Sequence, residues 1–211
     1  MALAQKTFGR LSLYRHILDT LLAEGTRSLF SHELAQLAGV TAAQVRRDLM
    51  PARITGSPTK GYEIRALVHA IGGLIDARSP ESAVLVGIGN LGRAILAHFH
   101  GRNPKLSIVA AFDDDPTKVN RILHGTVCYP LDDLPTTVRD QGIRIGIVTV
   151  PAAAAQTVAD LLVQSGVTGL LNFAPVRLQL PANVYLEEID FGMSLEKVAY
   201  YTRGRVAKGG R

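Results

Sequence analysis

The chain has 211 residues and a formal net charge of +5 at pH 7, a length that suits one large domain or two small ones. It has no apolar run near the ~18 residues of a membrane-spanning helix, and its N-terminus has early charges without a secretory cleavage pattern. We therefore expect no membrane partner and no signal peptide. The single cysteine, Cys128, excludes an intrachain disulfide framework and favours a reducing, cytoplasmic environment.

Positive charge gathers at the two ends of the chain. Residues 1–65 hold nine Lys and Arg against five Asp and Glu, whereas residues 66–202 hold ten against thirteen. A basic N-terminal region on a slightly acidic body suggests that this region binds a polyanion. Residues 203–211 hold four basic residues and no acidic one. For this tail, contact with nucleic acid and a frayed, solvated end both stay open.

The N-terminal third has the pattern of a small helical unit. Apolar residues recur at helical spacing over residues 10–24, and Gly25 ends this helix. Two shorter helices follow, the first capped by Ser31 and ended by Gly39, the second capped by Thr41. Two short helices joined by a tight glycine turn predict a helix-turn-helix.

Turn residues follow the second short helix. Pro51 ends that helix, and Gly56, Pro58 and Gly61 punctuate the next stretch. This pattern predicts a small hairpin, a wing beside the helices. Residues 66–80 then predict a connecting helix that ends in a polar linker at a domain boundary.

The second short helix and the wing carry side chains that suit DNA. A helix fits the major groove, where Arg bonds guanine or grips phosphate and Gln reads adenine. Basic residues on a wing hold phosphate or reach the minor groove. The candidate DNA-binding residues are Gln44, Arg46, Arg47, Arg53 and Lys60. A helical bundle with a solvated polar face remains the alternative.

From residue 80 onward, apolar strands alternate with helices. Strands are expected at 83–87, 107–112, 126–129, 144–150, 169–173 and 184–187, with helices at 91–100, 152–166 and 191–202. The unbroken apolar run at 144–150 is typical of a strand buried on both faces. We therefore predict an α/β fold in which the helix-turn-helix precedes a Rossmann-like, doubly wound, mainly parallel sheet.

A glycine cluster joins the first of these strands to its helix. Gly87 allows a tight turn, Gly89 lets the backbone approach a pyrophosphate, and Gly92 permits close helix–strand packing. The helix start offers unpaired N–H groups and the positive end of its dipole to the phosphates. Three glycines in an ordinary turn are the alternative.

An acidic residue stands where a dinucleotide site needs one. Asp113 comes 21 residues after Gly92, directly after the second strand. Its carboxylate can accept both ribose hydroxyls and would repel a 2′-phosphate, which favours NAD(H) over NADP(H). Loops at the same sheet edge would line the nicotinamide half or be plain core loops. The expected cofactor-binding residues are Gly87, Ile88, Gly89, Asn90, Leu91, Gly92, Asp113, Thr149, Val150, Pro151 and Asn172.

The sequence shows no pattern for catalysis. None of the six histidines sits in a motif for hydride transfer, and no His, Cys, Asp or Glu spacing suggests a metal. Cys128 is either a redox thiol or a small residue packed in a strand. Little chain remains for a substrate domain. We therefore expect no enzyme, no small-molecule substrate and no metal.

Several stretches together resemble the Rex family of redox-sensing transcriptional repressors. The likeness covers nearly the whole chain and rests on RLSLYRHIL, VTAAQVRRDL, VGIGNLGRA, AFDDDPTKV, VTVPAAAAQTVADLL, GVTGLLNFAPVRLQLP and EEIDFGMSLEKVAYY. The resemblance implies a homodimer whose terminal helix, residues 191–202, is domain-swapped and inserts beside the partner's N-terminal domain. It also implies that NADH closes the dimer and releases double-stranded operator DNA, that NAD+ permits repression, and that the operator is palindromic. It adds Asp190 and Phe191 to the cofactor site.

The resemblance divides the chain into a winged-helix domain (1–79), a Rossmann NAD(H)-binding domain (80–188), and a dimerisation helix with a basic tail (189–211). One departure lies at residues 50–53, which read Met-Pro-Ala-Arg where the family has Ser-Tyr-Phe-Gly. This leaves the operator sequence, and DNA binding itself, open. A Rex-like paralogue without operator binding and a small NAD-dependent oxidoreductase are the alternative functions.

A second departure concerns redox coupling. The family links redox state to shape through a tyrosine, an arginine and an aspartate, and the matching positions here hold His98, His16 and Asp190. Imidazole titrates near neutrality, so we hypothesise a weakened or pH-modulated switch. Simple drift at a disused switch is the alternative.

Overall fold

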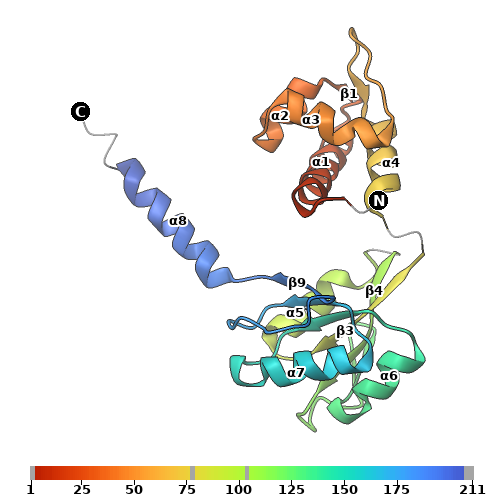
Figure 1. Ribbon diagram of the computed structural model, residues 1–211, viewed down its shortest axis with the longest axis vertical. Helices are drawn as coiled ribbons and strands as arrows, with labels where there is room; N and C mark the ends of the chain where they lie inside the picture. Colours follow the sequence, from red (N-terminus) through yellow and green to blue (C-terminus); the bar gives the residue numbers. More distant parts are fainter. Residues whose placement is uncertain (1–2, 77–78, 103–104, 207–211) are drawn as a thin grey trace. The chain divides into compact units, whose positions relative to one another are not determined.

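The computed structural model describes residues 3–76, 79–102 and 105–206. The chain divides into two compact units, Met1–Arg78 and Ser79–Arg211 (Figure 1). The first unit is mainly helical, and the second is built on a seven-stranded sheet. The predicted α/β class with an N-terminal helix-turn-helix is confirmed.

The N-terminal unit packs its helices around one apolar core. Its helices are α1 (Gln5–Ala23), α2 (Ser31–Ala38), α3 (Ala42–Leu49) and α4 (Ile64–Ile75), with a 3-10 turn at Met50–Ala52. Each helix contributes side chains that are almost fully buried, among them Leu11, Tyr14, Leu34, Val45 and Leu67. Helix α1 begins five residues earlier than the periodicity indicated, and it ends before Gly25, as expected.

The capping of α2 differs from the prediction. Ser31 is the first helical residue, and Phe30 occupies the N-cap, where its amide donates to the Glu33 carboxylate at 2.6 Å. A glutamate at the third helical position often bonds the N-cap amide in this way. The other two expectations hold: Gly39 ends α2 in the left-handed conformation, and the Thr41 hydroxyl accepts from the Gln44 amide at 3.1 Å.

The wing forms from two segments that are distant in sequence. Strand β2 (Tyr62–Glu63) pairs antiparallel with β1 (Ser28–Leu29), a strand between α1 and α2 too short to be predicted. Reciprocal backbone hydrogen bonds of 2.7 and 2.8 Å join Ser57 and Gly61 and close the tip. Gly61 has a φ of 70°, and a Cβ there would lie 2.3 Å from the Leu29 carbonyl oxygen, so this turn requires glycine.

The sheet of the C-terminal unit runs in the order β5-β6-β4-β3-β7-β8-β9. All neighbouring strands are parallel except β5 and β6. The chain starts in the middle, builds one side and then crosses to build the other, which is the doubly wound arrangement. The strands are β3 (Glu81–Val86), β4 (Leu106–Asp113), β5 (Ile122–Leu123), β6 (Thr126–Pro130), β7 (Ile145–Val148), β8 (Gly169–Asn172) and β9 (Tyr185–Glu188).

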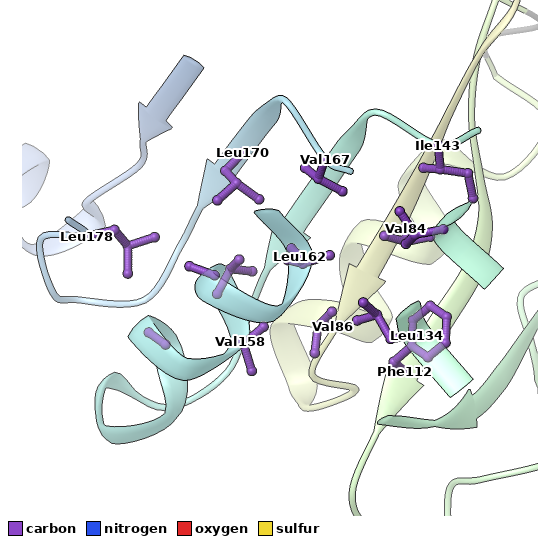
Figure 2. Close-up of a cluster of buried hydrophobic side chains, with 14 of the residues drawn as sticks. Val84, Val86, Phe112, Leu134, Ile143, Val158, Leu162, Val167, Leu170 and Leu178 are labelled. Atoms are coloured by element: carbon purple, nitrogen blue, oxygen red, sulfur yellow. The ribbon is translucent and has the colours of Figure 1, made fainter. Parts of the chain in front are cut away.

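Helices cover both faces of this sheet. Val84 and Val86 of β3 join the cluster under α6 (Leu134–Asp140) and α7 (Ala152–Ser165) (Figure 2). The alternate residues Ala83 and Leu85 join the cluster under α5 (Asn90–Phe99). Burial on both faces explains why apolar residues follow one another without alternation in β3. Strand β5 and helix α6 were not predicted, since both are short and only weakly patterned.

The last helix, α8 (Phe191–Val206), starts where the sequence indicated and continues beyond residue 202. Phe191, Leu195 and Val198 recur at helical spacing, and their side chains are 61%, 69% and 58% exposed. Such a stripe normally packs against a core. Within the described residues, the ring of Phe191 stacks on Phe173, but most of the apolar face of α8 stays exposed.

Candidate functional site

The loop after β3 requires glycine at two positions. Gly87 has a φ of 99°, and a Cβ there would lie 2.8 Å from the carbonyl carbon of Thr149. A Cβ on Gly92 would lie 2.2 Å from the carbonyl oxygen of Gly87, so α5 packs directly on the loop. Both glycines therefore fix the loop at the start of α5.

Gly89 differs from the other two glycines. Its φ is −81°, and a Cβ there would have no atom within 4 Å. Neither backbone conformation nor internal packing demands glycine at this position. The backbone of Gly89 instead lines an open pocket, where the missing side chain leaves room for a ligand to approach.

Asp113 ends β4 and is buried beside this loop. Its Oδ2 accepts a hydrogen bond from the Ile88 amide at 2.6 Å, and its Oδ1 accepts one from the Asp115 amide at 2.9 Å. The Lys118 Nζ lies 3.2 Å from both oxygens. Burial alone would raise the pKa of Asp113, but these hydrogen bonds and the Lys118 charge outweigh it and lower the pKa. Asp113 is thus a carboxylate at neutral pH.

A pocket of about 670 Å³ lies at the carboxyl ends of β3, β4 and β7. This is the switch point of the sheet, where nucleotides bind in doubly wound folds. Its lining consists of Val86, Gly87, Gly89, Asp113, Asp114, Lys118, Leu131, Thr149, Val150, Pro151, Ala153, Ala154 and Val158. Thr149 joins the end of β7 to the glycine loop. Its hydroxyl oxygen lies 2.9 Å from the Val86 carbonyl oxygen and 2.7 Å from the Gly87 carbonyl oxygen.

Six of the predicted cofactor residues line this pocket: Gly87, Gly89, Asp113, Thr149, Val150 and Pro151. Ile88 points into the core and offers only its backbone, while Gly92 lies beneath the loop. Asn90 and Leu91 form the first turn of α5. Asp114 and Lys118 also belong to the lining. Lys118 was not predicted, although it stands in the stretch AFDDDPTKV.

The remaining three predicted residues lie outside the pocket. The Asn172 amide donates to the Val176 carbonyl at 2.9 Å and accepts from the Ala174 amide at 2.9 Å, so this side chain shapes its own loop. Asp190 accepts from the Met193 amide at 2.9 Å and lines a separate pocket of about 250 Å³. The Phe191 ring stacks on Phe173 with centroids 6.1 Å apart.

The predicted DNA-binding side chains fall into two groups. Arg46, Arg47, Arg53 and Lys60 are exposed, and Arg46 also donates to the Ser31 hydroxyl at 3.1 Å. Gln44 is only half exposed, because its amide donates to Asp48 Oδ1 at 2.9 Å. The side-chain nitrogen of Gln44 therefore already makes a hydrogen bond within the protein.

An unpredicted polar cluster supports the recognition helix α3. Asp48 is 3% exposed and accepts from both Arg10 and the Tyr14 hydroxyl, the latter at 3.0 Å. Burial alone would raise the pKa of Asp48, but hydrogen bonds from Arg10, Gln44 and Tyr14 outweigh it and lower the pKa. Burial and the bond to Asp48 raise the pKa of Tyr14 to about 12. The cluster joins α1 to α3 and so fixes the helix that presents Arg46 and Arg47.

The three residues assigned to redox coupling are all exposed. His16 belongs to α1 of the first unit, whereas His98 on α5 and Asp190 before α8 belong to the second. Cys128 is buried, which raises the pKa of its thiol, and it packs with Leu85 and Leu96. It is therefore a core residue in this state of the protein. Within the described ranges, no group of three or more His, Cys, Asp and Glu could hold a metal, and no helix could cross a membrane.

A winged helix-turn-helix joined to a nucleotide-type pocket defines the class of a ligand-responsive DNA-binding regulator. Family models match both parts: a putative DNA-binding protein N-terminus over residues 2–49 and a CoA-binding domain over residues 78–176. The redox-sensing transcriptional repressor Rex of Syntrophobacter fumaroxidans is 37% identical over 196 residues, 92% of this chain and 93% of that protein. This chain therefore belongs to the Rex family, whose named members are repressors and not enzymes.

Solved structures agree with this assignment. RSP, a Rex-family repressor, in complex with β-NAD+ and operator DNA matches with a TM-score of 0.87 and 26% identity, covering 98% of this chain and 95% of that chain. RSP in complex with β-NADH matches with the same score and identity, covering 98% of this chain and 97% of that chain.

Proposed function

We propose that this protein represses transcription by binding operator DNA and that it senses the NADH/NAD+ ratio. One observation carries the proposal: a single chain combines exposed arginines on a recognition helix with a pocket in which the Gly89 backbone and Asp113 face a nucleotide-sized space. Membership of the Rex family supports it, as do the two ligand states of RSP. An oxidoreductase is disfavoured because the relatives of this chain are named as transcriptional repressors.

Each wall of the pocket has a distinct binding role in this proposal. Backbone amides at the start of α5, from Gly89 onward, hold the diphosphate. Asp113 accepts the hydroxyls of the adenosine ribose. Thr149, Val150 and Pro151 line the nicotinamide half. When bound, the nicotinamide ring is cationic in its oxidised form and neutral in its reduced form, and this difference is what the protein has to sense.

Asp113 also argues for the ligand class. The CoA-binding family model matches residues 78–176, so CoA is the second candidate ligand. CoA carries a phosphate on the 3′-oxygen of its ribose, and NADP(H) carries one on the 2′-oxygen. A buried carboxylate at the ribose subsite repels either phosphate and accepts two free hydroxyls. NAD(H) is therefore the ligand that this subsite favours.

DNA binding and nucleotide binding must influence each other for sensing to occur. By linkage, if NADH weakens operator binding, then operator DNA weakens NADH binding by the same factor. We place the working parts at residues 1–79 for DNA, 80–188 for nucleotide, and 189–211 for dimerisation. In this proposal the apolar stripe of α8 is covered in a homodimer, and the dimer binds a palindromic operator.

Paired titrations test the proposal. Affinities for NAD+, NADH and CoA are measured by calorimetry with and without a palindromic operator chosen from a promoter library. We expect NADH to bind more weakly in the presence of operator than in its absence. Nucleotide binding without DNA binding would favour a paralogue that acts through another partner, turnover of NADH with a small carbonyl would favour an enzyme, and absence of nucleotide binding would refute the sensor.

A further inference from the structure

Lys118 lies against the ribose subsite of the nucleotide pocket. Its ammonium is 3.2 Å from both oxygens of Asp113 and 3.4 Å from Oδ2 of Asp115. Its side chain is partly buried, at 24% exposed, and lines the same pocket as Gly89. Burial would lower the pKa of Lys118, but the bonds to Asp113 and Asp115 raise it overall, so the ammonium stays charged at neutral pH.

The hydrogen-bonding capacity of Asp113 places Lys118 beside the bound sugar. A carboxylate has about four acceptor sites. Two are taken by the Ile88 and Asp115 amides, and the Lys118 ammonium spans both oxygens. Two ribose hydroxyls fit only if Lys118 gives up at least part of its contact. The ammonium then lies next to the sugar, within the same pocket.

The charges around this subsite are unequal. Asp113, Asp114 and Asp115 supply three carboxylates within three consecutive residues, two of which line the pocket. Lys118 is the cationic side chain of that lining, and the described part of the chain adds no second one there. The carboxylates repel a 2′-phosphate, whereas the ammonium attracts it.

We propose that Lys118 is a specificity-determining residue of the nucleotide site: its ammonium offsets the carboxylate of Asp113 and limits how strongly the site rejects a 2′-phosphate. This rests on the proposed nucleotide-binding function. A lysine that only bound the nucleotide would weaken NADH binding when removed, but this proposal makes a different prediction. Removing the cation sharpens the preference for NADH over NADPH, because the three carboxylates are then unopposed.

The test compares Lys118→Met with Lys118→Arg and with the unaltered protein. Dissociation constants for NADH and NADPH are measured at low salt, with weak ligands measured by displacement of NADH. We expect Lys118→Met to raise the NADPH-to-NADH ratio of dissociation constants by about tenfold, the order of magnitude for removing one charge close to the phosphate. Lys118→Arg keeps the cation and should leave the ratio within about threefold of the unaltered protein.

Two further measurements separate this role from a purely structural one. If Lys118 only held Asp113 in place, Lys118→Met would change both affinities by the same factor, and an unchanged or lowered ratio would overturn the proposal. In an Asp113→Asn background, where NADPH is repelled less, Lys118→Met should weaken NADPH binding more than NADH binding.

Thermal unfolding without nucleotide checks that each variant is folded. If the unaltered protein binds neither nucleotide, the proposed function fails; if it binds NADH and the ratio does not rise, only the role of Lys118 fails.

Discussion

Arg10 on α1 holds Asp48 on α3 through two hydrogen bonds, from Nε to Oδ2 at 2.6 Å and from Nη2 to Oδ1 at 2.7 Å. The two residues are 38 positions apart, so this ion pair is a tertiary contact that fixes the recognition helix. Asp48 is almost fully buried, whereas Arg10 is partly exposed. Removing the arginine leaves a buried carboxylate with weaker compensation.

The first prediction is that Arg10→Met destabilises the N-terminal unit by about 3 kcal/mol, the lower part of the range for breaking a buried ion pair, because Tyr14 and Gln44 still donate to Asp48. Hydrogen exchange of α1 and α3 amides in the full chain measures this loss. Arg47→Met is the matched control, since Arg47 is exposed. It should change stability by less than about 0.5 kcal/mol and yet weaken DNA binding. Equal stability losses in both variants would contradict the role of the pair.

The second prediction is that the polar cluster around Asp48 makes folding stability depend on pH in the acid range. The pKa of Asp48 in the folded protein lies below its ordinary value of 3.8. The contribution of Asp48 to folding stability is therefore fully present above pH 3.8, and it is lost as the pH falls through the pKa of the folded protein. Asp48→Asn has no group that titrates there. The difference in unfolding temperature between the unaltered protein and Asp48→Asn should therefore narrow between pH 6 and pH 3 in calorimetric scans. A constant difference would show that the charge of Asp48 contributes nothing.

The sequence predicts local features better than distant contacts. The roles of Gly87 and Gly92 follow from spacing, because the turn and the helix that need them adjoin in the chain. Asp48 was not singled out, since a lone acid on a short amphipathic helix usually faces solvent. Its burial depends on Arg10, far away in the sequence. Lys118 was not predicted for a similar reason. It stands in a loop, and only the folded chain brings its ammonium to both oxygens of Asp113.

Side-chain hydrogen bonds to nearby backbone groups account for two details that periodicity does not encode. Ser31 is a residue type that often occupies the N-cap, but α2 starts one residue earlier, and the Phe30 amide at the N-cap donates to the Glu33 carboxylate. The side chain of Asn172, at the carboxyl end of β8, bonds the backbone of its own loop at Ala174 and Val176. Both arrangements depend on the path of the backbone, which the spacing of apolar residues does not give.

The third prediction separates the roles of two glycines. Gly89→Ala should fold normally, with a stability loss under about 1 kcal/mol, because its Cβ meets no protein atom and only an N-cap preference changes. It should weaken NADH binding at least about tenfold, since the methyl group enters the space where a phosphate must approach. Gly92→Ala should instead cost about 1–3 kcal/mol in stability, because its Cβ clashes with the Gly87 carbonyl.

Calorimetry with NADH and denaturant unfolding of both variants measure the two effects. The expected result is a crossed pattern, in which one variant loses affinity and the other loses stability. If Gly89→Ala binds NADH as well as the unaltered protein does, the open backbone beside Gly89 is not the phosphate site.

The fourth prediction concerns His16 and His98, the two histidines that the resemblance to the Rex family assigns to redox coupling. If they couple the nucleotide site to DNA binding, the double variant His16→Gln with His98→Gln should lose most of the release of operator DNA by NADH, as measured by fluorescence anisotropy. His69→Gln changes an exposed histidine on α4 and should keep the release. A double variant that NADH releases as effectively as the unaltered protein would indicate a disused switch.

The last prediction concerns the stripe of Phe191, Leu195 and Val198 on α8. Burying one such side chain fully contributes about 1.5–3 kcal/mol, so a helix that leaves three of them exposed gains strongly from a partner. Leu195→Glu with Val198→Glu places two charges on this stripe. The double variant should be monomeric at micromolar concentration in analytical ultracentrifugation, while the unaltered protein is a dimer. Glu196→Gln, which changes an exposed residue of the same helix outside the stripe, should remain dimeric.

Because one recognition helix reads only half of a palindrome, the monomeric variant should also lose operator affinity while each subunit still binds NADH. A double variant that stays dimeric would mean that another surface holds the two subunits together.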